Sequence, residues 1–87
     1  MALLRTAGIA LAATGAAHFA VPKAFEPISS LPFPQDTRAW IKRNGATELV
    51  LGLAISAEKT RKAGLVGAAV YTAWLGARTA SGLRNAG

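Results

Sequence analysis

Three long apolar segments with almost no charge constrain the fold of this chain more than any other feature of its sequence. They cover residues 6–22, 44–57 and 63–77, and only the second contains a charged residue, Glu48. Alanine and glycine supply much of this apolar character, and the 87 residues include just two Trp, one Tyr and three Phe. A soluble domain this short normally needs large core side chains, disulfides or a metal. The sequence therefore favours a membrane-embedded or partner-dependent helical protein.

We predict an all-α fold, a small transmembrane bundle in which one domain covers residues 1–87. Its membrane helices are expected at residues 3–21, 37–57 and 63–81. At 1.5 Å per residue, the first helix approaches the roughly 30 Å thickness of the hydrocarbon core. The other two reach that length only with their flanking residues. A cleaved signal peptide is the alternative interpretation of the first segment, and we expect a retained helix.

The predicted connections differ in character. Residues 22–36 contain four prolines, which lack a backbone donor and restrict the residue before them. We therefore predict an apolar loop lying at the membrane interface, followed by Asp36 as the N-cap of the second helix. Residues 58–62 form a short basic loop that makes the helices on either side antiparallel neighbours. Residues 82–87 are predicted to be a short tail.

Composition and charge argue against several classes of function. The chain has no cysteine, which excludes disulfides, thiolate metal sites and a cysteine nucleophile. One histidine and four acidic residues are too few for a self-contained metal site, so we expect no metal and no cofactor of the protein's own. The net charge is +6, but the cations flank the apolar segments in small groups, as they do at the ends of membrane helices. We expect no nucleic-acid partner.

Small residues recur at helical spacing in all three segments. In lipid, such residues let helix backbones approach closely, and this contact drives association. We expect helix packing at these positions: Gly8, Ala12 and Gly15; Gly45 and Gly52; Ala63 with Gly67; and Gly64 with Ala68.

Glu48 is the most informative polar residue because an unpaired carboxylate inside an apolar helix costs a few kcal/mol or becomes protonated. It should face the bundle interior, with Asn44 one turn earlier on the same side. His18 lies at a similar depth near the end of the first helix, so a His18–Glu48 pair is geometrically possible. A proton-linked or quinone-facing site is one interpretation. We favour the other, a structural polar pair, and predict no catalytic residue.

The aromatic residues Trp40, Tyr71 and Trp74 also allow two interpretations. They could stack on a cofactor ring, but interface anchoring or packing is the more common role. The sequence contains no glycine-rich phosphate loop, nucleotide fingerprint, haem motif or Ser/His/Asp triad.

Three stretches resemble, in their order and spacing, the DoxX-like family of small bacterial membrane proteins. They are Gly-Ala-Ala-His-Phe-Ala-Val-Pro-Lys-Ala-Phe at 15–25, Gly-Ala-Thr-Glu-Leu-Val-Leu-Gly-Leu at 45–53 and Lys-Thr-Arg-Lys at 59–62, with Leu31-Pro and Trp40 between the first two. The resemblance implies a membrane partner of redox enzymes, or a quinone-linked sulfur oxidoreductase subunit. His18 and Glu48 match the polar positions of the family pattern. The predicted three helices depart from the four that are usual in that family.

The resemblance also implies that the N-terminus and residues 59–62 face the cytoplasm. That orientation places four cations inside and six outside, so the positive-inside rule mildly favours the reverse.

We therefore expect a multi-pass accessory subunit of the bacterial inner membrane that packs against a larger complex in the lipid bilayer, such as a respiratory or other redox assembly. Any quinone would come through that complex. The alternative is a DoxX-like quinone- or sulfur-linked redox component, with His18 and Glu48 as candidate cofactor-binding residues. A soluble three-helix bundle is the third interpretation.

Overall fold

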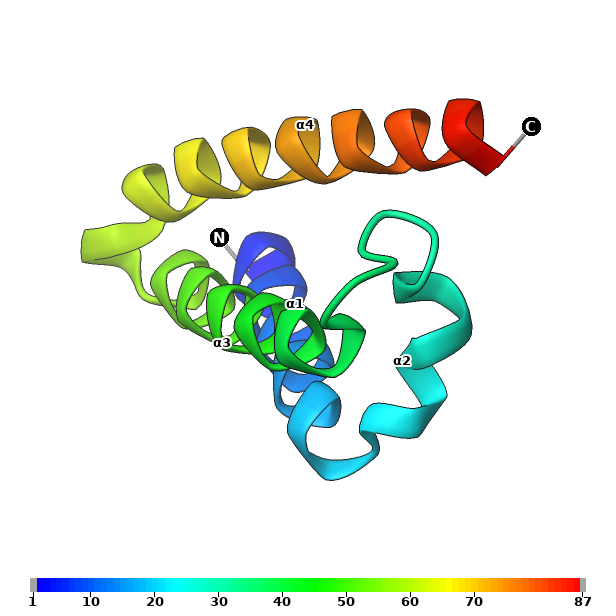
Figure 1. Cartoon of the computed structure of the whole chain (residues 1–87). Coiled ribbons are helices and arrows are strands. Elements are labelled where there is room, and N and C mark those ends of the chain that lie inside the picture. The colour runs from blue at the N-terminus through cyan, green and yellow to red at the C-terminus, as the bar shows by residue number, and fades with distance from the viewer. Residues whose placement is uncertain (1, 87) are drawn as a thin grey trace.

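The structure, a computed structural model, describes residues 2–86 and is all-helical over that range. Four α-helices follow one another: α1 (Ala2–Ala20), α2 (Pro22–Ser29), α3 (Thr37–Ser56) and α4 (Arg61–Ala86), with a 3-10 turn, η1 (Glu58–Thr60), before the last. Met1 and Gly87, which the predicted domain includes, lie outside the described residues. Figure 1 shows α1 crossing behind α3, α4 running along one side of the molecule and α2 at the opposite corner.

The helices α1 and α3 form the closest helix–helix contact in the fold, and glycine makes it possible. A Cβ atom built on Gly8 would lie 2.6 Å from the backbone nitrogen of Ser56, and one on Gly45 would lie 2.5 Å from Cβ of His18. Side chains at Gly15 and Gly52 would overlap the backbone of the facing helix. The predicted small-residue packing is therefore observed for this pair, and the two helices run antiparallel.

Helix α4 returns along α3 in the opposite direction. Gly64 and Gly67 face Ile55 and Leu51, whereas a Cβ atom added to Gly76 would have no neighbour within 4 Å. The turn between the helices is held by Arg61, whose Nε donates to the carbonyl of Ile55 at 2.9 Å. This bond satisfies one of the free carbonyls at the end of α3.

The prediction of a loop over residues 22–36 is wrong for its first half, because residues 22–29 form α2. Pro22 occupies the first turn of this helix, where its missing N–H is not needed and its fixed φ is already helical. Pro27 lies inside the helix, where it lacks the N–H that would bond to the carbonyl of Lys23. The break at Val21 bends the chain by 101° between α1 and α2. The bundle therefore has four helices where three were predicted.

Other boundaries also differ. The last helix begins at Arg61 and continues to Ala86, so most of the predicted tail is helical. Asp36 precedes α3 as predicted, but its φ of 55° is left-handed and its side chain makes no capping hydrogen bond.

Few apolar side chains are buried. Phe33 and Ile41 are the largest fully buried ones, at 1% and 0% exposure. Within the described residues, no single helix has the length and hydropathy of a membrane span, and only the bent pair α1–α2 has both together.

Candidate functional site

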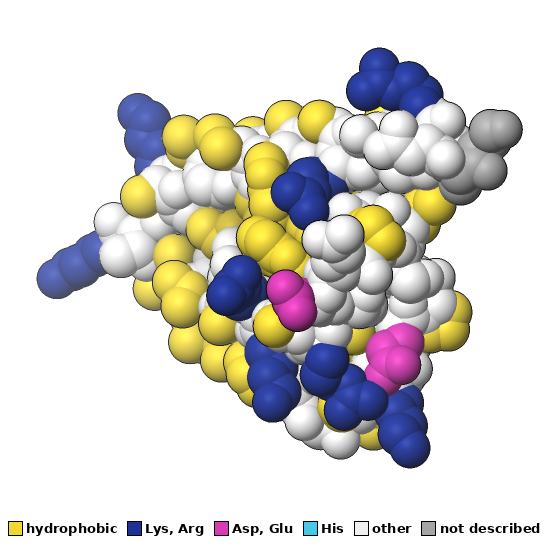
Figure 2. Space-filling view, viewed as in Figure 1, with side chains coloured by type: hydrophobic (Ala, Val, Ile, Leu, Met, Phe, Trp, Pro, Cys, Tyr) yellow, Lys and Arg dark blue, Asp and Glu magenta, His cyan; other side chains and the backbone are white. Residues whose placement is uncertain are grey.

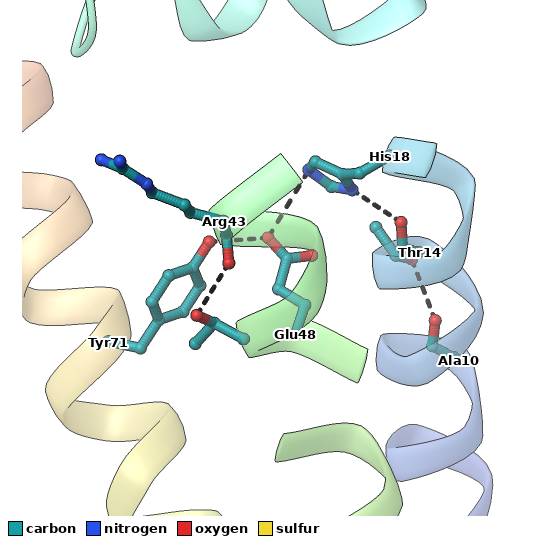
Figure 3. Close-up of polar contacts among 7 residues, drawn as sticks. Ala10, Thr14, His18, Arg43, Glu48 and Tyr71 are labelled. Atoms are coloured by element: carbon teal, nitrogen blue, oxygen red, sulfur yellow. Dashed lines mark hydrogen bonds and ion pairs between the residues drawn. The ribbon is translucent and has the colours of Figure 1, made fainter. Parts of the chain in front are cut away.

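The polar residues of three helices meet where α1 and α4 both approach α3. Tyr71 on α4 donates its hydroxyl hydrogen to Oε2 of Glu48 on α3, with 2.7 Å between the oxygens. Nε2 of His18, near the end of α1, lies 3.8 Å from the same Oε2. Figure 3 shows both side chains directed at the carboxylate from opposite sides. His18 and Glu48 are buried, as the sequence predicted for Glu48.

His18 is held in one orientation by two contacts. Its Nδ1 lies 2.7 Å from the carbonyl oxygen of Thr14 one turn earlier. Because a carbonyl oxygen only accepts, Nδ1 carries the hydrogen, and this leaves Nε2 to face Glu48. The ring of Phe25 on α2 stacks on the imidazole, with 3.7 Å between ring centroids and 20° between planes. The bend between α1 and α2 thus serves to bring Phe25 back over His18.

A cavity of about 480 Å³ opens beside this cluster. Its polar end is formed by His18, Asn44 and Glu48, and its walls include Phe25, Phe33 and Leu75. The volume falls within the roughly 300–1,000 Å³ that small-molecule sites occupy. Apolar walls around a few convergent polar groups are also typical of such sites.

Asn44 contributes unused hydrogen-bonding capacity to the cavity. Its side chain is buried, with 6% of the residue exposed. It lines the cavity one turn before Glu48. Among residues 2–86, its amide makes no hydrogen bond with another side chain or with the backbone, so its donor and acceptor remain available.

Tyr71 is the member of the cluster that the sequence analysis missed, since we considered it only as an anchor or a stacking residue. Glu48 and Tyr71 lie at nearly equal distances along the chain from the turn η1. In an antiparallel pair, such residues come level with each other. That spacing is the signal that could have found the contact.

Trp40 and Trp74 pack with each other and with Phe33. The ring centroids of Phe33 and Trp40 are 4.8 Å apart, and those of Trp40 and Trp74 are 5.7 Å apart. The guanidinium of Arg78 lies 4.7 Å from the Phe33 centroid and 5.3 Å from that of Trp40. This aromatic cluster, defined as Phe33, Trp40, Trp74 and Arg78, fixes α4 to the segment that joins α2 to α3.

The part of the chain that the structure describes contains no group of three or more His, Asp or Glu side chains that could hold a metal ion. The chemistry available at the cavity is hydrogen bonding by the side chains of Glu48, His18 and Tyr71.

A family model described as a domain of unknown function (DUF8561) matches residues 7–86. No curated protein and no solved structure matches the chain.

Proposed function

Since the chain belongs to the DUF8561 family, we propose a role that rests on its own residues: it is a small accessory subunit that lies in the membrane and packs against a larger integral membrane complex. The bacterial inner membrane is the location that the sequence predicts. The supporting observation is the position of its charges relative to its long helices.

Every charged residue except Glu48 lies outside residues 6–22, 44–57 and 63–77. The contacts of the fold bring these three segments side by side. Gly8 faces Ser56 and Gly15 faces Leu49, while Gly64 faces Ile55. The segments thus form a common belt, the apolar belt, which contains one charged residue, Glu48, and has basic groups at both of its ends.

The belt is somewhat thinner than a bilayer. The helical parts of these segments, residues 6–20, 44–56 and 63–77, span about 20–23 Å at 1.5 Å per residue, against a hydrocarbon core of roughly 30 Å. Long Lys and Arg side chains at the ends can extend to the headgroups, and bilayers thin locally around short segments. The length is therefore compatible with a membrane position.

Apolar side chains are exposed on the belt. Val50 and Val70 are 64% and 65% exposed, and Val66 is 61% exposed. Figure 2 shows yellow apolar side chains mainly over the left part of one face, with dark blue basic side chains at its tips, in its lower part and near its middle. Contiguous apolar surface of this kind marks contact with lipid or with another protein.

The outer side of α4 supports a protein partner. Ala69, Ala73 and Gly76 are exposed there at helical spacing, and Gly76 has open space around it. Small residues on an unpacked helix face allow another helix to approach closely in lipid. In this role the Glu48–Tyr71 bond is structural, because it gives a buried carboxylate the partner that it needs inside an apolar belt.

A pair of lysine substitutions tests this proposal. Val70→Lys places a charge in the belt, where a lysine at the centre of a helix costs about 2.5–3.5 kcal/mol of insertion free energy. Leu83→Lys, the matched control, places it beyond Arg78 at a residue that is 59% exposed. We expect carbonate-washed membranes and the native complex to retain the control and lose the Val70 variant. Recovery of the unaltered chain in the aqueous fraction would contradict the proposal.

A redox component is the second candidate, and the observation that favours it is the cavity beside His18 and Glu48. The resemblance to the DoxX-like family stays a prediction, and the choice of a quinone as the ligand is inferred from that resemblance. The purified chain should then bind a quinone stoichiometrically without its complex. An accessory subunit should instead bind none and co-purify stoichiometrically with the same membrane complex.

A further inference from the structure

We infer that the cavity between α1, α2, α3 and α4 is a binding site for an apolar molecule that carries a hydroxyl group, and that this hydroxyl bridges His18 and Glu48. The inference goes beyond the accessory role and does not depend on it. It rests on the geometry of the polar end of the cavity.

The gap between His18 and Glu48 is the first observation. Nε2 and Oε2 are 3.8 Å apart, which is too long for a direct hydrogen bond. One oxygen atom placed beside them can lie within hydrogen-bond distance of both, at about 2.8 Å from each. Both side chains line the cavity, so an oxygen at this point would belong to a molecule that occupies it.

The fixed hydrogen on Nδ1 decides which oxygen fits. With Nδ1 donating to Thr14, a neutral His18 presents Nε2 as an acceptor, and the bridging atom must donate to it. A protonated His18 presents a donor instead, and the bridging atom must accept from it and donate to Glu48. A hydroxyl group bridges the pair in the second case, because it accepts from Nε2–H and donates its one hydrogen to Oε2 of Glu48; in the first case it can donate to Nε2 or to Glu48, but not to both.

Carbonyl and ether oxygens fit poorly because they only accept. Neither can bond to a neutral His18, and neither gives the Glu48 carboxylate a donor. Oε2 of Glu48 already accepts from Tyr71 and has a second lone pair for the hydroxyl. A ligand that leaves a buried acceptor of the site without a donor binds less favourably. The site should therefore discriminate strongly between ligands that can donate a hydrogen bond and ligands that cannot.

The remaining cavity surface indicates the size and polarity of the rest of the ligand. Phe25, Phe33 and Leu75 supply apolar walls, and the volume is about 480 Å³. An aromatic ring or a short alkyl body matches these walls. The Asn44 amide offers a further donor and acceptor at the polar end, where a second polar atom of the ligand would be held.

The test uses one pair of probes on the full chain in detergent micelles: 4-butylphenol and its methyl ether, 4-butylanisole. His18 is the one histidine in the sequence, so isotope labelling of histidine gives a single imidazole signal from the site. We expect 4-butylphenol to shift the Nε2 signal saturably. The ether, which partitions into micelles more readily, should bind at least about tenfold more weakly.

Two variants locate the effect. Glu48→Gln removes the charge of the bridging carboxylate and should weaken phenol binding about fivefold, because hydrogen bonds to charged groups are the stronger ones. Glu58→Gln removes a carboxylate from the exposed turn η1 and should leave binding unchanged. Equal binding of the two probes to the unaltered chain would overturn the inference, as would no saturable shift with 4-butylphenol. Because this comparison needs no substitution, it stands even if the Glu48 variant does not fold.

Discussion

The hydroxyl of Tyr71 on α4 donates a hydrogen bond of 2.7 Å to the carboxylate of Glu48 on α3. This bond joins the last helix to the closely packed pair α1–α3 and gives Glu48, the acid buried in the apolar belt, its one direct donor among the described side chains. Around it, His18 and the cavity complete the candidate site.

Removing the hydroxyl of Tyr71 should loosen α4. We expect Tyr71→Phe to lower the free energy of unfolding by about 1–3 kcal/mol, because it removes a hydrogen bond to a charged group and leaves the buried Glu48 carboxylate without that donor. Unfolding in mixed micelles, followed by helical circular dichroism, measures the loss. A double-mutant cycle with Glu48→Gln should show coupling between the two residues. Additive effects would mean that the bond contributes nothing to stability.

The crossing of α1 and α3 should not tolerate a methyl group. A Cβ on Gly15 would overlap the backbone of Leu49, so Gly15→Ala should destabilise the protein by about 1–3 kcal/mol. Gly76→Ala is the matched control, since open space surrounds that position. The control should raise stability by about 0.5–1 kcal/mol through helix propensity. Similar unfolding midpoints for the two variants would contradict the close approach.

Arg78 should stabilise the position of α4 through the aromatic cluster. Its guanidinium lies 4.7 Å from the ring centroid of Phe33. Arg78→Ala should therefore cost about 0.5–2 kcal/mol and change the near-ultraviolet circular dichroism of the two tryptophans. Arg84→Ala removes the same charge from the exposed last turn of α4 and should leave both quantities unchanged. A near-ultraviolet spectrum that is the same in both variants would show that Arg78 does not order the rings.

The sequence predicted the three long helices because their apolar segments contain no charged residue except Glu48 and no proline before Pro22. The second was expected at residues 37–57 and the structure has Thr37–Ser56. The third was expected to begin after the basic residues, but Arg61 and Lys62 belong to its first turn. Charge is tolerated there because the first turn extends beyond the apolar belt. Proline content misled the prediction for residues 22–29, since Pro22 suits a helix start.

For the site, the depth of each residue within its helix predicted that His18 and Glu48 could meet, and they lie together. Phe25 could not be predicted above His18, because its place depends on the 101° bend after α1. Tyr71 was missed because the side that α4 turns toward α3 depends on the turn at Glu58–Thr60. Helical periodicity alone does not determine the geometry of such turns.

Solvent accessibility along α4 tests the membrane position of the apolar belt most directly. The chain has no cysteine, so spin labels can be attached to single cysteines introduced at Val70 and, as the control outside the belt, at Lys59. In lipid vesicles, the account predicts that the Val70 label collides mainly with oxygen, which concentrates in the hydrocarbon, and the Lys59 label mainly with a water-soluble nickel chelate. Nickel accessibility at Val70 equal to that at Lys59, in the chain with its native complex bound as well as alone, would contradict it.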